Sequence, residues 1–403
     1  MTISLKLYAI FILLFLDFGI TIGPLKIPFF SSILTLLIIG TSLNSIKYSL
    51  TGGLLLFIFG CFGYFTSDSG ASLSKVMSSI IQSTVSLLIF FSISQYSKHI
   101  NNDIKIEKTS KILLLFTLLL LILERYGLTD SLSLQFARTV YSGEVGFKTY
   151  ENIFSEERDI ALAGFRRPTL FSPEPSIAAI GLSLLLIIRN LFATNFRSTI
   201  FNITLTIIVW FLIKSPIILL ALVVIATKEL VNRKKISSML LYLPFALIFA
   251  GLLLSLIYSR YSSMVTQFSI EETSEGLRLM LPFIIVYESW TNLYILGTGP
   301  GSIYSEEFMM NLNPLKISIF GTNATALFFL YYGPIVGCFL IYLFVKAAFN
   351  INSILKIDKS LIYSILVLLF LANTLGTYEA PRLLGIFGFY MIFLQSAKKL
   401  GKI

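Results

Sequence analysis

Apolar residues in this chain gather in long runs that charged residues seldom interrupt. A bilayer core about 30 Å thick requires a helix of about 20 mostly apolar residues to cross it. About twelve segments approach this length, and they cover residues 5–23, 27–45, 49–65, 76–96, 112–128, 173–189, 199–213, 215–231, 236–258, 322–345, 361–379 and 382–397. The pattern predicts an all-α polytopic membrane protein, with about twelve transmembrane helices in a single bundle over residues 1–403.

Composition supports this prediction. Hydrophobic residues make up 56% of the chain and charged residues 13%, and the mean hydropathy is +0.84, values far from those of soluble domains. The first apolar run begins at Leu5, contains Asp17 and has no small-residue cleavage site, so we expect a retained span rather than a signal peptide. Cys61 and Cys338 lie within apolar runs, and two isolated thiols provide neither a disulfide framework nor a metal site.

Lysines and arginines concentrate in alternate connections between the predicted spans. The short connections on the opposite side contain only Lys26, Lys75, Lys214 and Arg382. Because basic residues are retained on the cytoplasmic side, we expect both termini in the cytoplasm. This rule accounts for the formal charge of +10 without any anionic partner, so the sign of the charge does not identify a partner. No nucleic acid is expected.

Two connections on the outer, periplasmic side are much longer than the rest, residues 124–172 and 259–321. Long connections in compact bundles usually carry function or structure of their own. In the second loop, residues 276–301 form an apolar stretch that Pro282 and Glu288 interrupt. We expect a helix that lies at the outer surface or enters the membrane partway, because a thirteenth crossing would put the C-terminal lysines outside.

The stretch RRPTLFSPEPSIAAIGL places two arginines and a glutamate where the first long loop enters the membrane. Ser172 suits the N-cap of the following helix, and Glu174 its first turn, where the helix dipole favours a carboxylate. In one interpretation Glu174 only stabilises that helix start, and Arg166 and Arg167 rest among lipid headgroups. In the other, the two planar guanidinium groups bind phosphate oxygens, and Glu174 orients them or acts as a base.

Two arginines of the second loop are candidates for the same phosphate-binding cluster. Arg278 precedes the apolar stretch and Arg260 follows a predicted span. They would join the cluster if both loops fold over one cavity; alternatively, each anchors its segment at the membrane surface.

Other motifs limit the chemistry. GTGPGS at 297–302 lacks the Lys-Ser/Thr of nucleotide-binding loops, so we expect a tight turn there. The only histidine, His99, lies in a cytoplasmic connection, which excludes a zinc site or a Ser-His-Asp set on the outer face. The acidic clusters SEERD and EET are interpreted as solvated surface. Neither a metal nor another cofactor is therefore expected.

Three segments together resemble the O-antigen polymerase (Wzy) family and the related O-antigen ligases. They are RRPTLFSPEPSIAAIGL, EGLRLMLPFIIVYESWTNLYILGTGPGS and TNATALFFLYYGPIVG, set in a polytopic bundle with two enlarged outer loops. The ligases carry a histidine in the later loop, where Asn323 stands here. The arginine-plus-glycine spacing of some polymerases does not follow Arg166, Arg167 or Arg278.

The resemblance implies transfer of a growing glycan from undecaprenyl diphosphate onto an incoming lipid-linked repeat unit, at the periplasmic face of a bacterial inner membrane. The implied partners are the undecaprenyl-diphosphate-linked oligosaccharide, membrane lipids, a chain-length regulator and a flippase. The candidate catalytic residues are Glu174, Arg166, Arg167 and Arg278. The candidate substrate-binding residues are Arg260, Asn323, Tyr287 and Arg125.

Two alternatives remain open, a flippase for lipid-linked oligosaccharides and an O-antigen ligase. A flippase would place charged residues inside many spans and show two-half symmetry, whereas charged residues here collect in the two outer loops. The missing histidine argues against the ligase. A structural scaffold would leave the arginine-bearing loops without a purpose.

Overall fold

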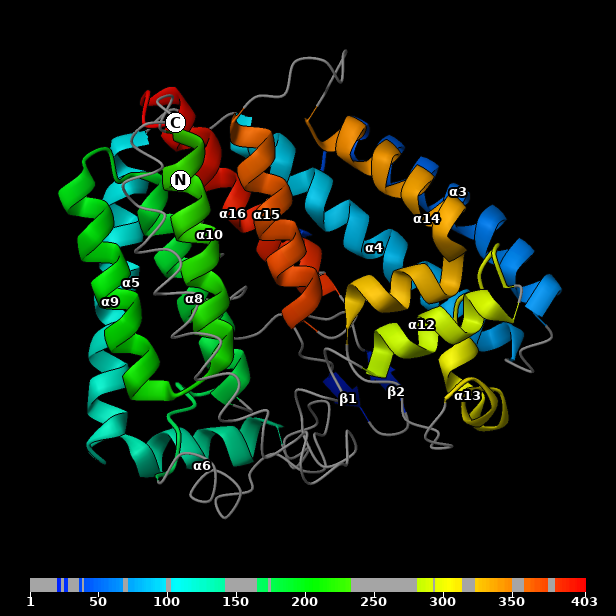
Figure 1. Ribbon diagram of the computed structural model, residues 1–403, viewed down its shortest axis with the longest axis horizontal. Helices are drawn as coiled ribbons and strands as arrows, with labels where there is room; N and C mark the ends of the chain where they lie inside the picture. Colours follow the sequence, from blue (N-terminus) through cyan, green and yellow to red (C-terminus); the bar gives the residue numbers. More distant parts are fainter. Residues whose placement is uncertain are drawn as a thin grey trace.

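The computed structural model describes the chain as a set of packed helices (Figure 1). The described residues are 20–22, 25–27, 36–37, 40–67, 72–98, 103–141, 165–172, 175–232, 281–292, 294–313, 323–349, 359–375 and 381–403. Within these ranges, nine helices coincide with predicted spans. They are α3 (Leu43–Ser67), α4 (Leu73–Lys98), α5 (Asp103–Arg125), α8 (Pro175–Leu191), α9 (Phe196–Ile213), α10 (Pro216–Asn232), α14 (Ala324–Phe349), α15 (Lys359–Thr374) and α16 (Pro381–Lys399).

Length and composition make several of these helices suitable for crossing a membrane. Among the described residues, three qualify outright: Leu43–Ser67, Leu73–Ser97 and Ala324–Phe349. A fourth qualifies if Ile106–Arg125 and the bent continuation Asp130–Phe136 count as one span. The helical membrane character is thus supported, while the number of twelve spans stays a prediction. The predicted span 236–258 lies outside the described residues.

The N-terminal region departs from the all-α prediction. Strands β1 (Ile20–Ile22) and β2 (Leu25–Ile27) pair antiparallel, with Ile20 opposite Ile27. Ile20–Ile22 and Ile27 fall within the predicted spans 5–23 and 27–45, so the expectation of helix is wrong at these residues, whereas Leu25 and Lys26 lie in the predicted connection. The β-branched sequence Ile-Thr-Ile of β1 favours extended backbone, a preference that the apolar character of the run conceals.

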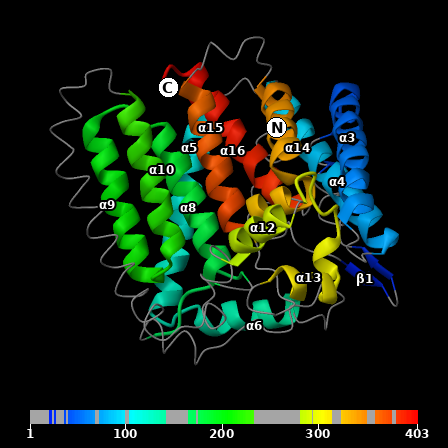
Figure 2. The ribbon, with the colours of Figure 1, turned by 45° about the vertical axis from the view of Figure 1, so that its right-hand side comes forward.

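The described helices form two groups that α15 and α16 join, since α15 contacts both α10 and α14. Helices α5, α8, α9 and α10 pack against one another, and α3, α4 and α14 form the other group (Figures 1 and 2). Helix α16 contacts α4, α5 and α8. Its aromatic side chains are buried, and the ring of Phe387 stacks on that of Phe90 from α4 with centroids 5.5 Å apart. The junction is therefore an apolar core rather than a hinge.

Large apolar side chains cover the outward faces of several helices. Examples are Leu50, Phe62 and Phe65 on α3, Leu115 and Phe116 on α5, and Phe201 and Phe211 on α9, each more than half exposed. A soluble protein rarely exposes apolar surface of this extent. These faces suit contact with lipid chains.

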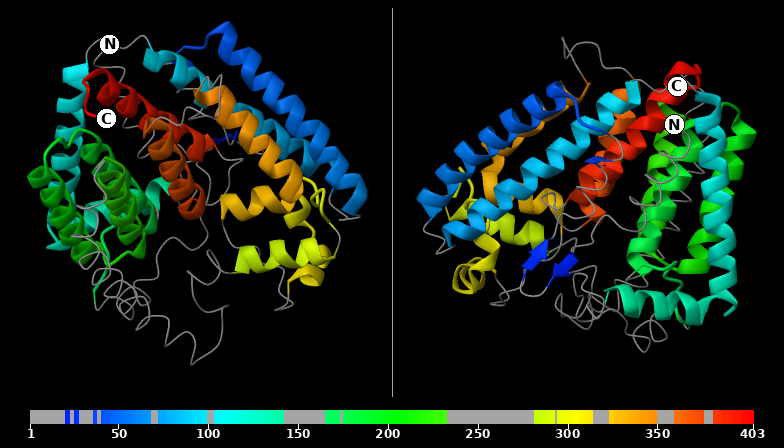
Figure 3. Two further views of the ribbon diagram at one scale, coloured as in Figure 1. Left: turned by 45° about the horizontal axis from the view of Figure 1, so that its top comes forward. Right: turned by 180° about the vertical axis from the view of Figure 1, so that it is seen from behind.

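Helix α14 is broken at Gly333–Pro334, where it changes direction (Figure 3). Gly333 has φ 67° and ψ 175°, angles that interrupt the helix. Pro334 has no N–H group, so the carbonyl of Leu330 loses its usual partner. An unpaired carbonyl in an apolar setting costs several kcal/mol, so the break needs donors from elsewhere.

The segment 297–302 supplies those donors. The N–H of Thr298 donates to the carbonyl of Leu330 at 2.9 Å, and the N–H of Gly299 donates to that of Tyr331 at 3.1 Å. The glycines of the motif all have positive φ, between 79° and 89°, a region that glycine enters without strain. The tight turn predicted for GTGPGS is confirmed, and it caps the broken helix.

Three short helical segments flank this turn. They are α12 (Leu281–Thr291), the 3-10 helix η4 (Ser302–Tyr304) and α13 (Glu306–Leu312). Helix α12 has 11 residues, and at 1.5 Å per residue it is about 16 Å long, half of a bilayer core. A helix is thus present within this stretch, and its position relative to the membrane stays a prediction.

In the first helix group, a buried lysine caps the C-terminal end of α8. Lys228 of α10 is 3% exposed. Its Nζ donates to the carbonyls of Leu191 and Ala193 at 3.4 and 3.2 Å, and also to that of Asn190. These carbonyls end a helix, where the macrodipole favours a cation.

Candidate functional site

Helix α5 leads into α6 (Asp130–Tyr141) through a bend of 105°. We call residues 124–133 the elbow. Gly127 has φ 80°, its N–H donates to the carbonyl of Glu124, and the N–H of Leu128 donates to that of Leu123. This is a Schellman motif, which glycine at C′ allows. Helix α6 consequently lies across the end of the first helix group (Figure 2).

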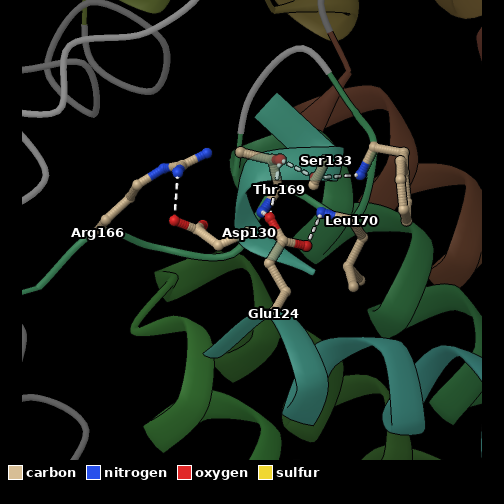
Figure 4. A network of polar contacts seen from close by, with 7 residues as sticks. Glu124, Asp130, Ser133, Arg166, Thr169 and Leu170 are labelled. Atoms are coloured by element: carbon tan, nitrogen blue, oxygen red, sulfur yellow. Dashed lines mark hydrogen bonds and ion pairs between the residues drawn. The ribbon is translucent and has the colours of Figure 1, made fainter. Parts of the chain in front are cut away.

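Glu124, the residue before the last of α5, is 4% exposed and binds the loop segment 165–172 (Figure 4). Its Oε1 accepts hydrogen bonds from the backbone N–H and the hydroxyl of Thr169, at 2.9 and 3.1 Å. Its Oε2 accepts one from the N–H of Leu170 at 2.8 Å. A buried carboxylate is costly without such donors. Glu124 therefore fixes the loop while remaining satisfied itself.

Ser133 of α6 holds the same turn from the other side. Its Oγ accepts the N–H of Phe171 at 3.0 Å and lies 2.9 Å from the hydroxyl of Thr169 (Figure 4). Leu170 and Phe171 both have left-handed backbone, with φ 51° and 62°, which costs about 1–3 kcal/mol for a residue other than glycine. The hydrogen bonds from the elbow therefore hold the turn in this strained backbone conformation, as surrounding structure must do wherever such strain persists.

The two arginines predicted from the sequence lie at the start of this held segment. Arg166 Nη1 is 2.6 Å from Oδ2 of Asp130, in the first turn of α6, where a carboxylate also stabilises the helix (Figure 4). Arg167 is 8% exposed. The structure thus brings both arginines to the elbow, one ion-paired and one buried.

Two further cations meet on a single aromatic ring. The Arg125 guanidinium carbon lies 3.5 Å from the ring centroid of Phe165, and Lys214 Nζ lies 5.2 Å from the same centroid. Arg125 ends α5, and Lys214 follows α9 in a left-handed conformation, its N–H donating to the carbonyl of Trp210. With Arg166 and Arg167, they give this end four cations.

The described carboxylates of this end only partly balance them. Glu124 and Asp130 leave the six charged groups with a net positive charge, and both carboxylates bind other partners in the elbow. A cluster with a net positive charge attracts anions. Four arginine and lysine side chains that converge from three separate chain segments are suited to phosphate oxygens.

Two predicted substrate-binding residues belong to the other group of helices. Tyr287 of α12 is 62% exposed. Asn323 is fully buried before α14: its Oδ1 accepts the N–H of Ala326 at 3.1 Å, and its Nδ2 is 3.3 Å from Oδ1 of Asn373. Asn323 thus caps α14, a structural role that the sequence did not suggest. Their contacts with substrate stay predictions.

Three other predicted residues lie outside the described part of the chain: Glu174, Arg260 and Arg278. The meeting of the two long loops therefore stays a prediction. A cavity of about 620 Å³ lies between α3, α4, α14, α15 and α16, with a mostly apolar lining that includes Thr325 and Lys346. None of its lining residues belongs to the elbow or to 165–172, so this cavity is not the hollow expected beneath the arginines.

Sequence reasoning missed Glu124, Ser133 and Lys214. Glu124 had one available signal, since a carboxylate at the end of an apolar run is expensive enough to need a partner. Lys214 stands alone between two apolar runs and counted only as a charge of an outer turn. Among the described residues, no three His, Cys, Asp or Glu side chains are grouped in a way that suits a metal ion. Comparison with known proteins finds no matching family model, no matching curated protein and no matching solved structure.

Proposed function

We propose that the protein is a polymerase of bacterial surface glycans, anchored in the inner membrane by about twelve spans with both termini in the cytoplasm. It would transfer a growing glycan from undecaprenyl diphosphate onto a lipid-linked repeat unit at the periplasmic face. The observation that carries the proposal is the cation cluster that the elbow holds at one end of an apolar bundle. A lipid-linked diphosphate has a negatively charged group that suits the cations and a lipid chain that suits the apolar bundle.

The reaction needs no group beyond side chains and substrates. A hydroxyl of the incoming unit attacks the anomeric carbon of the donor glycan, and a new C–O bond forms as the bond to the diphosphate breaks. The electron pair leaves with undecaprenyl diphosphate, and the hydroxyl proton passes to a base, for which Glu174 is the candidate from the sequence. Direct attack inverts the anomeric configuration.

The arginines would stabilise the charge that develops on the diphosphate. Preorganised cations in a site with little water supply several kcal/mol of such stabilisation, because they need not reorient during the reaction. The buried Arg167 and the fixed turn beside it match this requirement. Arg278 of the second loop is proposed to join them.

The proposed orientation follows from the positive-inside rule applied to the short connections, and both ends of the bundle carry cations. Arg125, Arg166 and Lys214 gather at the end where α6 lies, whereas Lys346 and Lys398 occupy the last turns of α14 and α16 at the opposite end (Figure 1). We assign the α6 end to the periplasm. The mostly apolar cavity suits lipid chains better than a charged glycan diphosphate, which does not favour the flippase alternative.

The test is reconstitution. The purified protein is mixed with synthetic undecaprenyl-diphosphate-linked repeat units, without nucleotide sugar or added metal, and products are separated by size. We expect polymer together with released undecaprenyl diphosphate. Arg197→Ala is the matched control, because Arg197 is an exposed arginine at the other end of α9. A preparation that is folded and membrane-embedded but leaves all units single would overturn the proposal.

A further inference from the structure

The cavity between α3, α4, α14, α15 and α16 has the size of a ligand site. Its volume is about 620 Å³, within the range of small-molecule pockets. Most of its described lining is aliphatic or aromatic, as at Leu55, Phe328 and Leu368. The hydroxyl of Ser83 in this lining already donates to the carbonyl of Ser79 at 2.9 Å. A sugar or a nucleotide would leave polar groups unpaired here, so the interior suits a hydrocarbon chain.

The cavity extends along the helices that enclose it. Its lining covers residues 48–56 of α3 and 83–91 of α4, and at 1.5 Å per residue each of these walls is about 12 Å long. One leaflet of bilayer hydrocarbon is about 15 Å thick. Three lining residues, Ile341 of α14 and Ile365 and Leu369 of α15, are each more than a third exposed. A lipid chain can therefore reach the cavity from the surface of the bundle.

One end of the cavity carries a cation. Lys346 is the only charged residue of the described lining, and it lies exposed in the last turn of α14, at the end of the bundle opposite α6 (Figure 1). The five enclosing helices contain no Asp or Glu over their described lengths. A lysine suits the C-terminal end of a helix in any case, but here its ammonium also adjoins an apolar cavity. This combination matches an amphiphile with an anionic headgroup.

Tyr48 of α3 lies at the same end of the cavity. The rings of Tyr48 and Phe344 both pack on Phe91, with centroids 5.5 and 6.4 Å away, and Phe344 precedes Lys346 by less than one helical turn. Tyr48 is 44% exposed. A tyrosine and a lysine together are typical of the level where lipid chains meet headgroups.

We infer that this cavity binds one chain of an anionic phospholipid, with the phosphate of its headgroup on Lys346. In the proposed orientation Lys346 faces the cytoplasmic leaflet, whose anionic lipids attract lysines. An undecaprenyl chain is several times longer than the cavity, so a phospholipid is the better occupant. A chain held here would contact α3 and α14 on one side and α15 and α16 on the other. The site would therefore stabilise the packing of these helices and does not depend on the proposed reaction.

The experiment measures lipid binding directly. The protein in detergent is titrated with phosphatidylglycerol, with phosphatidylcholine and with glycerol phosphate, and native mass spectrometry follows what stays bound. The thermal midpoint is the second readout, because a ligand of the folded state raises it. We expect phosphatidylglycerol to bind most tightly. Lys346→Gln should weaken its binding about fivefold, to the level of phosphatidylcholine, whereas Lys346→Arg should retain it.

A second variant tests the cavity itself. Ala347 is an exposed residue of the lining, so Ala347→Trp should obstruct the cavity and weaken the binding of both phospholipids. Two controls lie outside the described lining: Phe339→Trp, at a 46% exposed position of α14, and Lys398→Gln, in the last turn of α16. Neither should change lipid binding.

Three results would overturn the inference. The first is parental affinity for phosphatidylglycerol in folded Lys346→Gln and Ala347→Trp alike. The second is glycerol phosphate bound as tightly as the lipid, which would remove the role of the chain. The third is undecaprenyl phosphate bound more tightly than phosphatidylglycerol through the same two residues, which would remove the assignment to a phospholipid. Since neither variant alters the elbow, polymer formation by both tests the proposed function separately.

Discussion

The backbone N–H of Leu170 donates to Oε2 of Glu124 at 2.8 Å, across 46 positions of sequence. This bond ties the end of α5 to the turn that leads into α8. Together with the two hydrogen bonds that Thr169 donates to the same carboxylate, it fixes the loop that carries Arg166 and Arg167 relative to the helix bundle. The loop at this point is therefore built as rigidly as the helices that it joins.

Replacement of Glu124 should loosen this turn. The Glu124 carboxylate offers two acceptor oxygens to Thr169 and Leu170, whereas the amide of Glu124→Gln offers only one. Each buried N–H that is left unpaired costs about 1–3 kcal/mol. We expect a lower thermal midpoint and a loss of polymer. The measurement is thermal unfolding in detergent, with the glycan ladder in cells as the second readout.

The matched control lies on the same helix. Glu107 forms an i,i+4 ion pair with Lys111, with side chains 22% and 44% exposed, and such pairs contribute about 0.5 kcal/mol or less. Glu107→Gln should therefore leave both readouts close to those of the parent. Equal effects of the two substitutions would contradict the role given to Glu124.

Arg167→Ala, Arg166→Ala and Arg278→Ala are each expected to convert a ladder of long surface glycans into single-unit glycans. Arg167→Lys should restore little, because lysine has neither the planar fork nor its fixed geometry. The ladder is visualised by gel electrophoresis, with protein level checked by blot and Arg197→Ala as control. A normal ladder from all three alanine variants would remove the assigned site.

Gly333→Ala should destabilise the protein by more than 2 kcal/mol, roughly, since it adds backbone strain to a clash. A Cβ at Gly333 would overlap the carbonyl oxygen of Ile295. Gly40→Ala isolates the strain, because Gly40 has a similar φ of 79° but open space around its Cα. Its expected effect is about 1 kcal/mol. If the two variants had the same thermal midpoint, the close approach of Ile295 to Gly333 would not contribute to stability.

Lys228→Met should destabilise the first helix group by about 1–3 kcal/mol, because the carbonyls that end α8 would lose a buried charged donor. Methionine keeps the apolar stem, so the change in packing is small. The exposed Lys111 is a suitable comparison, as Lys111→Met removes a charge without a buried partner set. Hydrogen exchange of the last turn of α8, followed by mass spectrometry, should rise in the first variant alone.

The sequence predicted the helices well where apolar length decides the structure. Nine described helices coincide with predicted spans, because a run of about 20 apolar residues without backbone breakers has few alternatives to a helix. The hairpin β1–β2 was missed since four of its six residues are apolar and continue the adjoining apolar runs. The bend at Gly333–Pro334 follows a residue pair whose effect is local, but its capping by Thr298 depends on contact between distant segments.

The candidate site was predictable only in part for the same reason. Arg166 and Arg167 stand out in the sequence as adjacent cations before an apolar run. Asp130 binds Arg166 and Glu124 binds the turn at Thr169 and Leu170. Both carboxylates come from the preceding helices, and hydropathy does not indicate which carboxylate meets which part of the loop. Lys214 joins the cluster through the packing of α9, which a single charge between two spans does not reveal.

The break in α14 has a mechanical consequence for the segment that caps it. Two carbonyls of this helix are satisfied by amides of Thr298 and Gly299, and a setting with little water offers no substitute for them. Moving the segment 297–302 away would leave the donor and the acceptor of each of these hydrogen bonds unpaired. The segment and α14 are therefore expected to move together. A displacement of the adjoining helices α12 and α13 would therefore be transmitted to α14.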